Sequence, residues 1–112
     1  MTGQPDGTVI DLQHLERQTM GDGGLQAEVL KIFIDQMGEK AQGLDGSRPD
    51  LRDFAHGIKG SARGIGAVGV ASAAERLERG EGDIPALIED LRHEIGTAVA
   101  EAERLLANMK AT

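Results

Sequence analysis

Side chains that could take part in a reaction are most concentrated in residues 55–62, which read Ala-His-Gly-Ile-Lys-Gly-Ser-Ala. At about 100° per residue, a helix through this segment gathers its apolar residues on one side and turns His56 almost directly away from them. Lys59 follows one turn later and offers a cation, while Gly60 leaves bare backbone where a partner could approach. The polar side of the same helix carries two arginines, Arg52 and Arg63. An exposed imidazole among cations suits chemistry on a phosphoryl group.

The elements that must position this segment are helices, because apolar residues recur with a helical period along almost the whole chain. Residues 10–20 are expected to form a short first helix, and a second helix of about 20 residues should follow and end at Gly46. A capping box, Ser47-Arg48-Pro49-Asp50, would begin the helix of His56, which runs to about Ile65. The expected buried face of the second helix consists of Leu25, Val29, Ile32, Phe33, Met37 and Leu44.

Glycine and proline mark the remaining boundaries. Gly66 should turn the chain tightly into a fourth helix that ends near Gly80, and Asp83-Ile84-Pro85 should begin the longest helix. No segment alternates in the manner of a strand. The predicted fold is all-α, an antiparallel up-and-down four-helix bundle with a short additional N-terminal helix. Residues 1–9 are expected to be a flexible tail and residues 10–110 the single domain.

Composition excludes several functions. The 112 residues suffice for one domain but not for a nucleotide-binding catalytic domain in addition. The sequence has no cysteine, no apolar run near the roughly 18 residues that span a bilayer, and no visible signal peptide, so we expect a cytoplasmic protein without membrane contact. A net charge of −7 and two aromatic rings argue against binding nucleic acid. His14 and His93 lack a neighbouring Lys-Gly pair and are interpreted as plain surface residues, and no spacing indicates a metal site.

The segment that begins at His56 resembles the signature of the histidine-containing phosphotransfer (HPt) family of phosphorelays. That signature is a His followed by x-[Leu/Ile]-Lys-Gly-Ser/Ala-Ala and then Gly-Ala, and here residues 56–62 and Gly66-Ala67 supply it. Residues 25–34 and 73–78 also look like the flanking helices of that family. The resemblance therefore covers most of the chain.

The resemblance implies that His56 accepts a phosphoryl group from a receiver-domain aspartate of a hybrid kinase and passes it to the receiver of a response regulator. Lys59 would offset charge on the phosphoryl oxygens, and Arg63 would assist. Magnesium would come from the receiver, so no cofactor is expected in this chain, nor an ATP site or kinase activity of its own. Its partners would be receiver domains and a sensor or hybrid histidine kinase, and the protein itself would be a monomer. The docking patch would include Arg52, Gly57, Gly60 and Gly64.

Glu78 is predicted to contact His56. If the chain reverses at Gly66, His56 lies ten residues before the turn and Glu78 twelve after it, so the two differ in height by about 3 Å. Many HPt proteins look similar in carrying Glu or Gln at this spacing. A carboxylate that accepts a bond from Nδ1–H would fix the ring tautomer, leave Nε2 free and raise the basicity of the ring. The alternative is an ordinary exposed glutamate at a helix end.

Three other functions compete with this interpretation. A non-catalytic helical adaptor would dock a receiver or kinase through the same surface, and His56 would then be replaceable. The dimerising phosphoacceptor domain of a sensor kinase usually has an acidic residue directly after the histidine and a proline soon after, whereas Gly57 follows here and the next proline is Pro85. Residues 60–66 match the Gly-x-x-x-Gly-x-Gly loop of short-chain dehydrogenases, but no buried strand precedes them and the chain lacks the tyrosine that such catalysis requires.

Overall fold

The computed structural model describes residues 9–111, and these residues form helices joined by loops and turns, without a strand. The all-α class is therefore confirmed. The tail expected over residues 1–9 lies outside the described residues apart from Val9, which is half-buried. Among the described helices, none combines the length and apolarity needed to cross a membrane. The helices are α1 (Leu12–Gln18), α2 (Gly23–Gly43), α3 (Leu51–Ile65), α4 (Val68–Arg79) and α5 (Ile84–Ala111).

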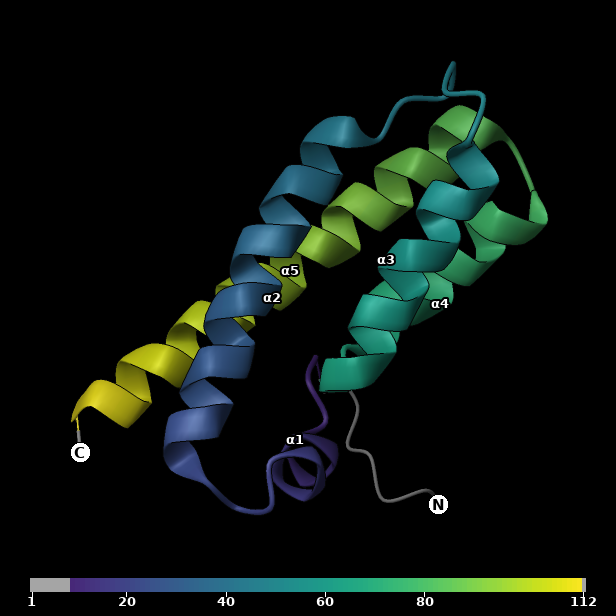
Figure 1. Cartoon of the computed structure of the whole chain (residues 1–112). Coiled ribbons are helices and arrows are strands. Elements are labelled where there is room, and N and C mark those ends of the chain that lie inside the picture. Colours follow the sequence, from purple (N-terminus) through teal and green to yellow (C-terminus); the bar gives the residue numbers. More distant parts are fainter. Residues whose placement is uncertain (1–8, 112) are drawn as a thin grey trace.

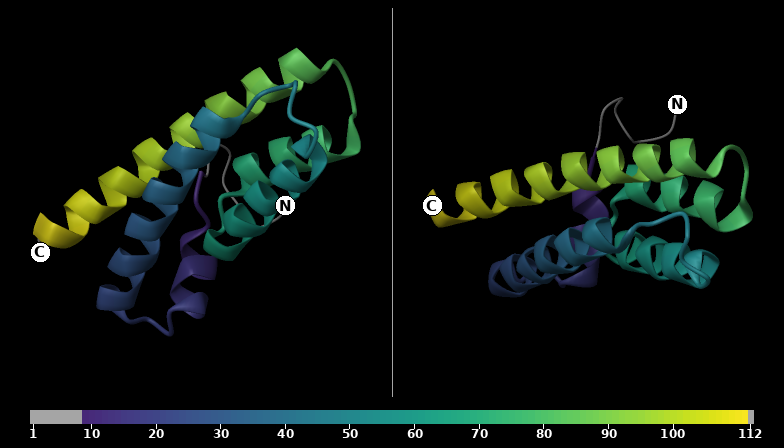
Figure 2. Two further views of the ribbon diagram at one scale, coloured as in Figure 1. Left: turned by 45° about the horizontal axis from the view of Figure 1, so that its top comes forward. Right: turned by 90° about the horizontal axis from the view of Figure 1, so that it is seen from above.

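The long helices pack in pairs, with α3 against α4 and α5 against both α2 and α4 (Figures 1 and 2). The short helix α1 lies near the end of α3, where Asp11 N–H donates to Gly66 O at 2.9 Å. Gly66 ends α3 with φ +80°, a conformation that glycine adopts at low cost. A Cβ at this position would also meet Asp11 Cβ at 3.0 Å. The predicted tight turn thus depends on glycine for both its backbone conformation and its packing.

Small residues line the contact between α3 and α4. Four alanines from the two helices are at most 1% exposed, and together with Ile58, Leu77 and the buried side chains of α5 they form part of one continuous core. Short side chains let the two helix axes approach closely, so residues at matching heights on the outer surface of the hairpin come within reach of each other. The alanines are Ala55, Ala62, Ala73 and Ala74.

The predicted buried face of α2 is partly wrong. Leu25 and Ile32 are 42% and 52% exposed, whereas Leu30 is fully buried. The face that packs into the core contains Leu30, Phe33 and Met37, and Leu25 and Ile32 lie roughly 110–130° around the helix from its centre. Since α2 carries apolar residues on more than one side, periodicity alone did not identify the side that its neighbours cover.

Several predicted boundaries also shift. The first helix is shorter than residues 10–20, and α2 ends at Gly43 rather than Gly46. The predicted capping box is wrong, because Ser47 N–H and Oγ–H both donate to Asp45 Oδ1 at 2.9 Å and the serine stays outside α3. Asp50 is the N-cap of α3, but its carboxylate binds the guanidinium of Arg48 through two hydrogen bonds instead of capping the helix.

The later boundaries agree with the sequence. Gly80 ends α4 with φ +65°, as a left-handed cap. Asp83 Oδ2 accepts a hydrogen bond from Ala86 N–H at 3.1 Å and so caps the first turn of the longest helix. The α3–α4 hairpin that these boundaries define is the part of the fold that carries His56.

Candidate functional site

His56 stands on the outer surface of α3, directly beside a buried part of the helix. Its neighbours Ala55 and Ile58 are fully buried, whereas the His56 side chain is 66% exposed. The amphipathic spacing of α3 therefore fixes the helix face on which the imidazole stands, and the ring is open to an approaching partner.

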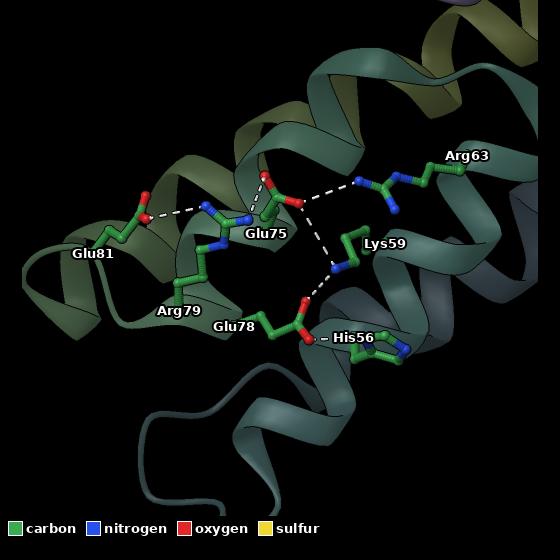
Figure 3. A network of polar contacts seen from close by, with 7 residues as sticks. All are labelled: His56, Lys59, Arg63, Glu75, Glu78, Arg79 and Glu81. Carbon is green, nitrogen blue, oxygen red and sulfur yellow. Dashed lines mark hydrogen bonds and ion pairs between the residues drawn. The ribbon is translucent and has the colours of Figure 1, made fainter.

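The ring of His56 is oriented by Glu78 of α4. Its Nδ1 lies 2.8 Å from Glu78 Oε2, as the register through Gly66 predicts (Figure 3). An ionised carboxylate can only accept, so Nδ1 carries the hydrogen and donates it. In this tautomer Nε2 has a free lone pair, and it lies on the side of the ring away from Glu78. Nε2 is therefore the ring nitrogen whose lone pair is available for chemistry.

Lys59 contacts the same carboxylate from the other side. Its Nζ lies 2.6 Å from Glu78 Oε1 and 3.8 Å from Glu75 Oε1. Lys59 and, after it, His56 hold the pKa of Glu78 below its ordinary value of 4.5, so Glu78 is ionised near neutral pH. Although Lys59 follows His56 by one turn, its side chain is only 13% exposed, because it lies along the seam between α3 and α4.

Glu75 is the site residue that sequence reasoning missed. Its Oε1 accepts a hydrogen bond from Arg63 Nη2 at 3.2 Å, and its Oε2 lies 3.9 Å from Arg79 Nη2. Arg79 in turn lies 3.6 Å from Glu81. The register through Gly66 could have indicated Glu75, because Lys59 lies seven residues before the turn and Glu75 nine after it, the same offset that pairs His56 with Glu78.

Comparison with known proteins shows the family to which the chain belongs. The family model of the Hpt domain matches residues 28–111. The chain belongs to the Hpt domain family. The crystal structure of the histidine phosphotransferase ShpA from Caulobacter crescentus is similar to it, with 31% sequence identity and a TM-score of 0.79. That match covers 93% of this chain and 95% of the other. A comparison with curated protein sequences gives no significant match.

Within this Hpt domain, the residues predicted to dock a partner surround His56 on α3. Arg52 is exposed, and so are the three glycines of the predicted patch. A Cβ built on any of these glycines would meet no heavy atom of the described chain within 4 Å. Packing inside the domain therefore does not explain why glycine occupies these positions, which are Gly57, Gly60 and Gly64.

The two other histidines of the Hpt domain differ from each other. His93 on α5 is exposed, as predicted. The interpretation of His14 as a plain surface residue is wrong, because its side chain is half-buried and its Nε2 is buried without a hydrogen-bond partner in the described part of the chain. Leu15 next to it is a core residue, so α1 carries His14 partly into the interface with the bundle. Among residues 9–111, no cluster of three His, Asp or Glu side chains is arranged to hold a metal ion.

Proposed function

We propose that this Hpt domain carries a phosphoryl group on His56 between two receiver domains. The observation that carries the proposal is the bond from His56 Nδ1–H to Glu78 Oε2, which leaves Nε2 as the free nucleophile on an exposed helix face. The similarity to a histidine phosphotransferase supports the same reaction. The donor would be the aspartyl phosphate of a hybrid kinase receiver, and the acceptor would be the receiver aspartate of a response regulator.

The transfer needs only the His56 imidazole, the phosphoryl group and the carboxylates of the two receivers. The lone pair of Nε2 attacks phosphorus, the P–N bond forms, and the P–O bond to the donor aspartate breaks, so the aspartate leaves as a carboxylate. The ring keeps its hydrogen on Nδ1 and gains positive charge as the P–N bond forms. Glu78 Oε2, 2.8 Å away, stabilises that charge. Passing the phosphoryl group to the second receiver reverses these steps.

The neighbouring residues would assist by charge and shape. Lys59 would act chiefly through the Glu78 carboxylate that it contacts at 2.6 Å, and Arg63 would add positive charge near the phosphoryl oxygens. Arg52 and the three exposed glycines of α3 would form the docking surface. The receiver would supply magnesium and the acceptor carboxylate, so the domain would need no ATP site and no kinase activity of its own.

The domain would act in the cytoplasm as a monomer, and its four long helices would follow the antiparallel up-and-down order. The competing function is a helical adaptor that binds a receiver or kinase through the same surface without chemistry. The two functions differ in whether His56 is needed for anything beyond binding.

The test is phosphoryl transfer from a receiver domain that has been phosphorylated with acetyl phosphate. The wild-type domain should acquire acid-labile phosphate, and His56→Gln should acquire none while it keeps the helical circular dichroism spectrum and receiver binding. His93→Gln, the matched control at another exposed histidine, should be labelled like the wild type. An unlabelled wild-type domain that still binds the receiver would establish the adaptor function, and label that persists in His56→Gln would place the phosphoryl group elsewhere.

A further inference from the structure

The surface beside His56 carries three cations and three carboxylates that form ion pairs with one another. Lys59, Arg63 and Arg79 face the carboxylates of Glu75, Glu78 and Glu81, and all of them lie along α3, α4 and the turn after α4 (Figure 3). With a neutral imidazole, the three cations balance the three anions. Phosphorylation of His56 places a phosphoryl group with a charge of about −1.5 to −2 beside this balanced set, on a ring that itself gains positive charge.

Glu75 is the member of this set that links the most cations. Lys59 and Arg63 approach the same oxygen, Oε1, at 3.8 and 3.2 Å, and Arg79 lies 3.9 Å from Oε2. The Glu75 side chain is 31% exposed, about half as much as the Arg63 and Arg79 side chains at 62% each. A half-buried carboxylate that holds three cations neutralises much of the positive charge that could otherwise stabilise a phosphoryl group.

We propose that Glu75 is a positioning residue that limits the stability of the phosphohistidine by holding Lys59 and Arg63. This inference rests on the proposed function of His56 and adds to it a residue that sets the direction of net transfer. Glu75 does not contact the reacting nitrogen in the structure, and its negative charge offsets that of the two cations at the phosphoryl group. By keeping their charge compensated, it makes the phosphoryl group easier to pass on.

The size of the effect follows from Coulomb's law. The phosphoryl group and the Glu75 carboxylate would lie on the order of 10 Å apart, on a surface where the effective dielectric constant is between about 20 and 80 and salt screens the interaction. Removing the negative charge of Glu75 should therefore shift the equilibrium toward phosphohistidine by about two- to tenfold. Because the interaction lies at the surface, the shift should fall strongly at high ionic strength.

The experiment measures the equilibrium ratio of phosphohistidine to phosphoaspartate after the domain is mixed with an equal amount of a receiver phosphorylated from acetyl phosphate. Glu75→Gln should raise this ratio about two- to tenfold in about 50 mM salt and much less in about 1 M salt. Glu75→Asp, which keeps the charge, should return the ratio most of the way to the wild-type value. Glu81→Gln removes the same charge from a residue that pairs with Arg79 at 3.6 Å, and it should leave the ratio unchanged.

A second variant tests the same idea from the cation side. Arg63→Gln should lower the ratio, and combining it with Glu75→Gln should bring the ratio back toward the wild-type value, because the pair is then removed together. Circular dichroism of each variant identifies any loss of folding, and Arg63, with a largely exposed side chain, offers a readout even if Glu75→Gln folds poorly.

The outcomes separate the two proposals. If the wild-type domain is labelled on His56 but Glu75→Gln has the wild-type ratio at low salt, or if Glu81→Gln shifts the ratio equally, the role of Glu75 is wrong and the proposed function stands. A shift that is the same at low and high salt also overturns the electrostatic role, since a change in packing would not be screened. If the wild-type domain takes no label on His56, the proposed function fails and this inference fails with it.

Discussion

Gly60 offers the sharpest test of the docking surface, because the fold would be more stable with another residue there. It lies within α3 one turn after His56, and a Cβ at this position would meet no heavy atom of the described chain within 4 Å. Glycine in an exposed helix interior costs about 0.5–1 kcal/mol relative to alanine. Gly60→Ala should therefore raise the free energy of unfolding by about that amount and the melting temperature by a few degrees.

The same substitution should slow phosphoryl transfer. The added methyl group stands next to the imidazole on the surface where a receiver must bring its phosphoaspartate close to Nε2, and displacing the reacting atoms by about 1 Å costs as much as a hundredfold in rate. Since the receiver can tilt to relieve part of the contact, we expect transfer to slow by about three- to thirtyfold. Initial rates of transfer from a phosphorylated receiver, measured beside urea unfolding curves, give both quantities.

Gly96 provides the matched control for this prediction. It is an exposed glycine within α5, and a Cβ there would also meet no heavy atom of the described chain within 4 Å. Gly96→Ala should gain the same stability and keep the wild-type transfer rate. If Gly60→Ala transfers as fast as Gly96→Ala, the glycines of α3 are not explained by close approach of a partner, and the docking surface must be sought elsewhere.

Three further results are expected. Gly43→Ala should lower the free energy of unfolding by about 1–3 kcal/mol in urea titrations, because its Cβ would lie 2.8 Å from the ring of Phe54. That ring has little room to move, since the guanidinium of Arg48 is stacked over it at 4.0 Å. Gly38→Ala is the control and should stabilise α2, because its Cβ would meet no heavy atom of the described chain within 4 Å. The pKa of Glu78 in the folded protein is lowered from 4.5, so the stabilisation by its carboxylate is present above that pH and is lost as the pH falls through the folded value. The melting temperatures of the wild type and Glu78→Gln should therefore converge in acid. A difference in melting temperature that stays constant with pH would contradict the assignment. Lys59→Met should slow transfer about tenfold without abolishing it, and an unchanged rate with several receivers would remove Lys59 from the site.

The fold was predictable where a single local signal decided the outcome. Gly66, Gly80 and Asp83 mark helix ends through their own backbone conformation or a cap within three residues, and the structure agrees at each of them. The face of α2 and the start of α3 depend instead on competition. Leu25 and Leu30 are equally apolar, and the Asp50 carboxylate can bind either a backbone N–H or Arg48, so tertiary packing and a neighbouring guanidinium decide what the local pattern leaves open.

The candidate site also contains features that local signals predict and features that depend on tertiary packing. The exposure of His56 follows from the apolar spacing of α3, and its contact with Glu78 follows from the residue counts on either side of Gly66. His14 is the opposite case. Its half-burial depends on how α1 lies against the bundle, and nothing within the short helix itself indicates that placement.

Lys59 shows why a correct choice of residue does not fix its role. The sequence places its charge one turn from His56 and suggests a direct contact with phosphoryl oxygens, but the structure places its Nζ 2.6 Å from the carboxylate that also orients the imidazole. A cation in that position withdraws charge from Glu78 and so weakens the hold of Glu78 on Nδ1–H, while the compensating carboxylate Glu75 withdraws charge from Lys59. The balance between these carboxylates, rather than the presence of the lysine alone, then determines how firmly Glu78 holds Nδ1–H when the phosphoryl group arrives.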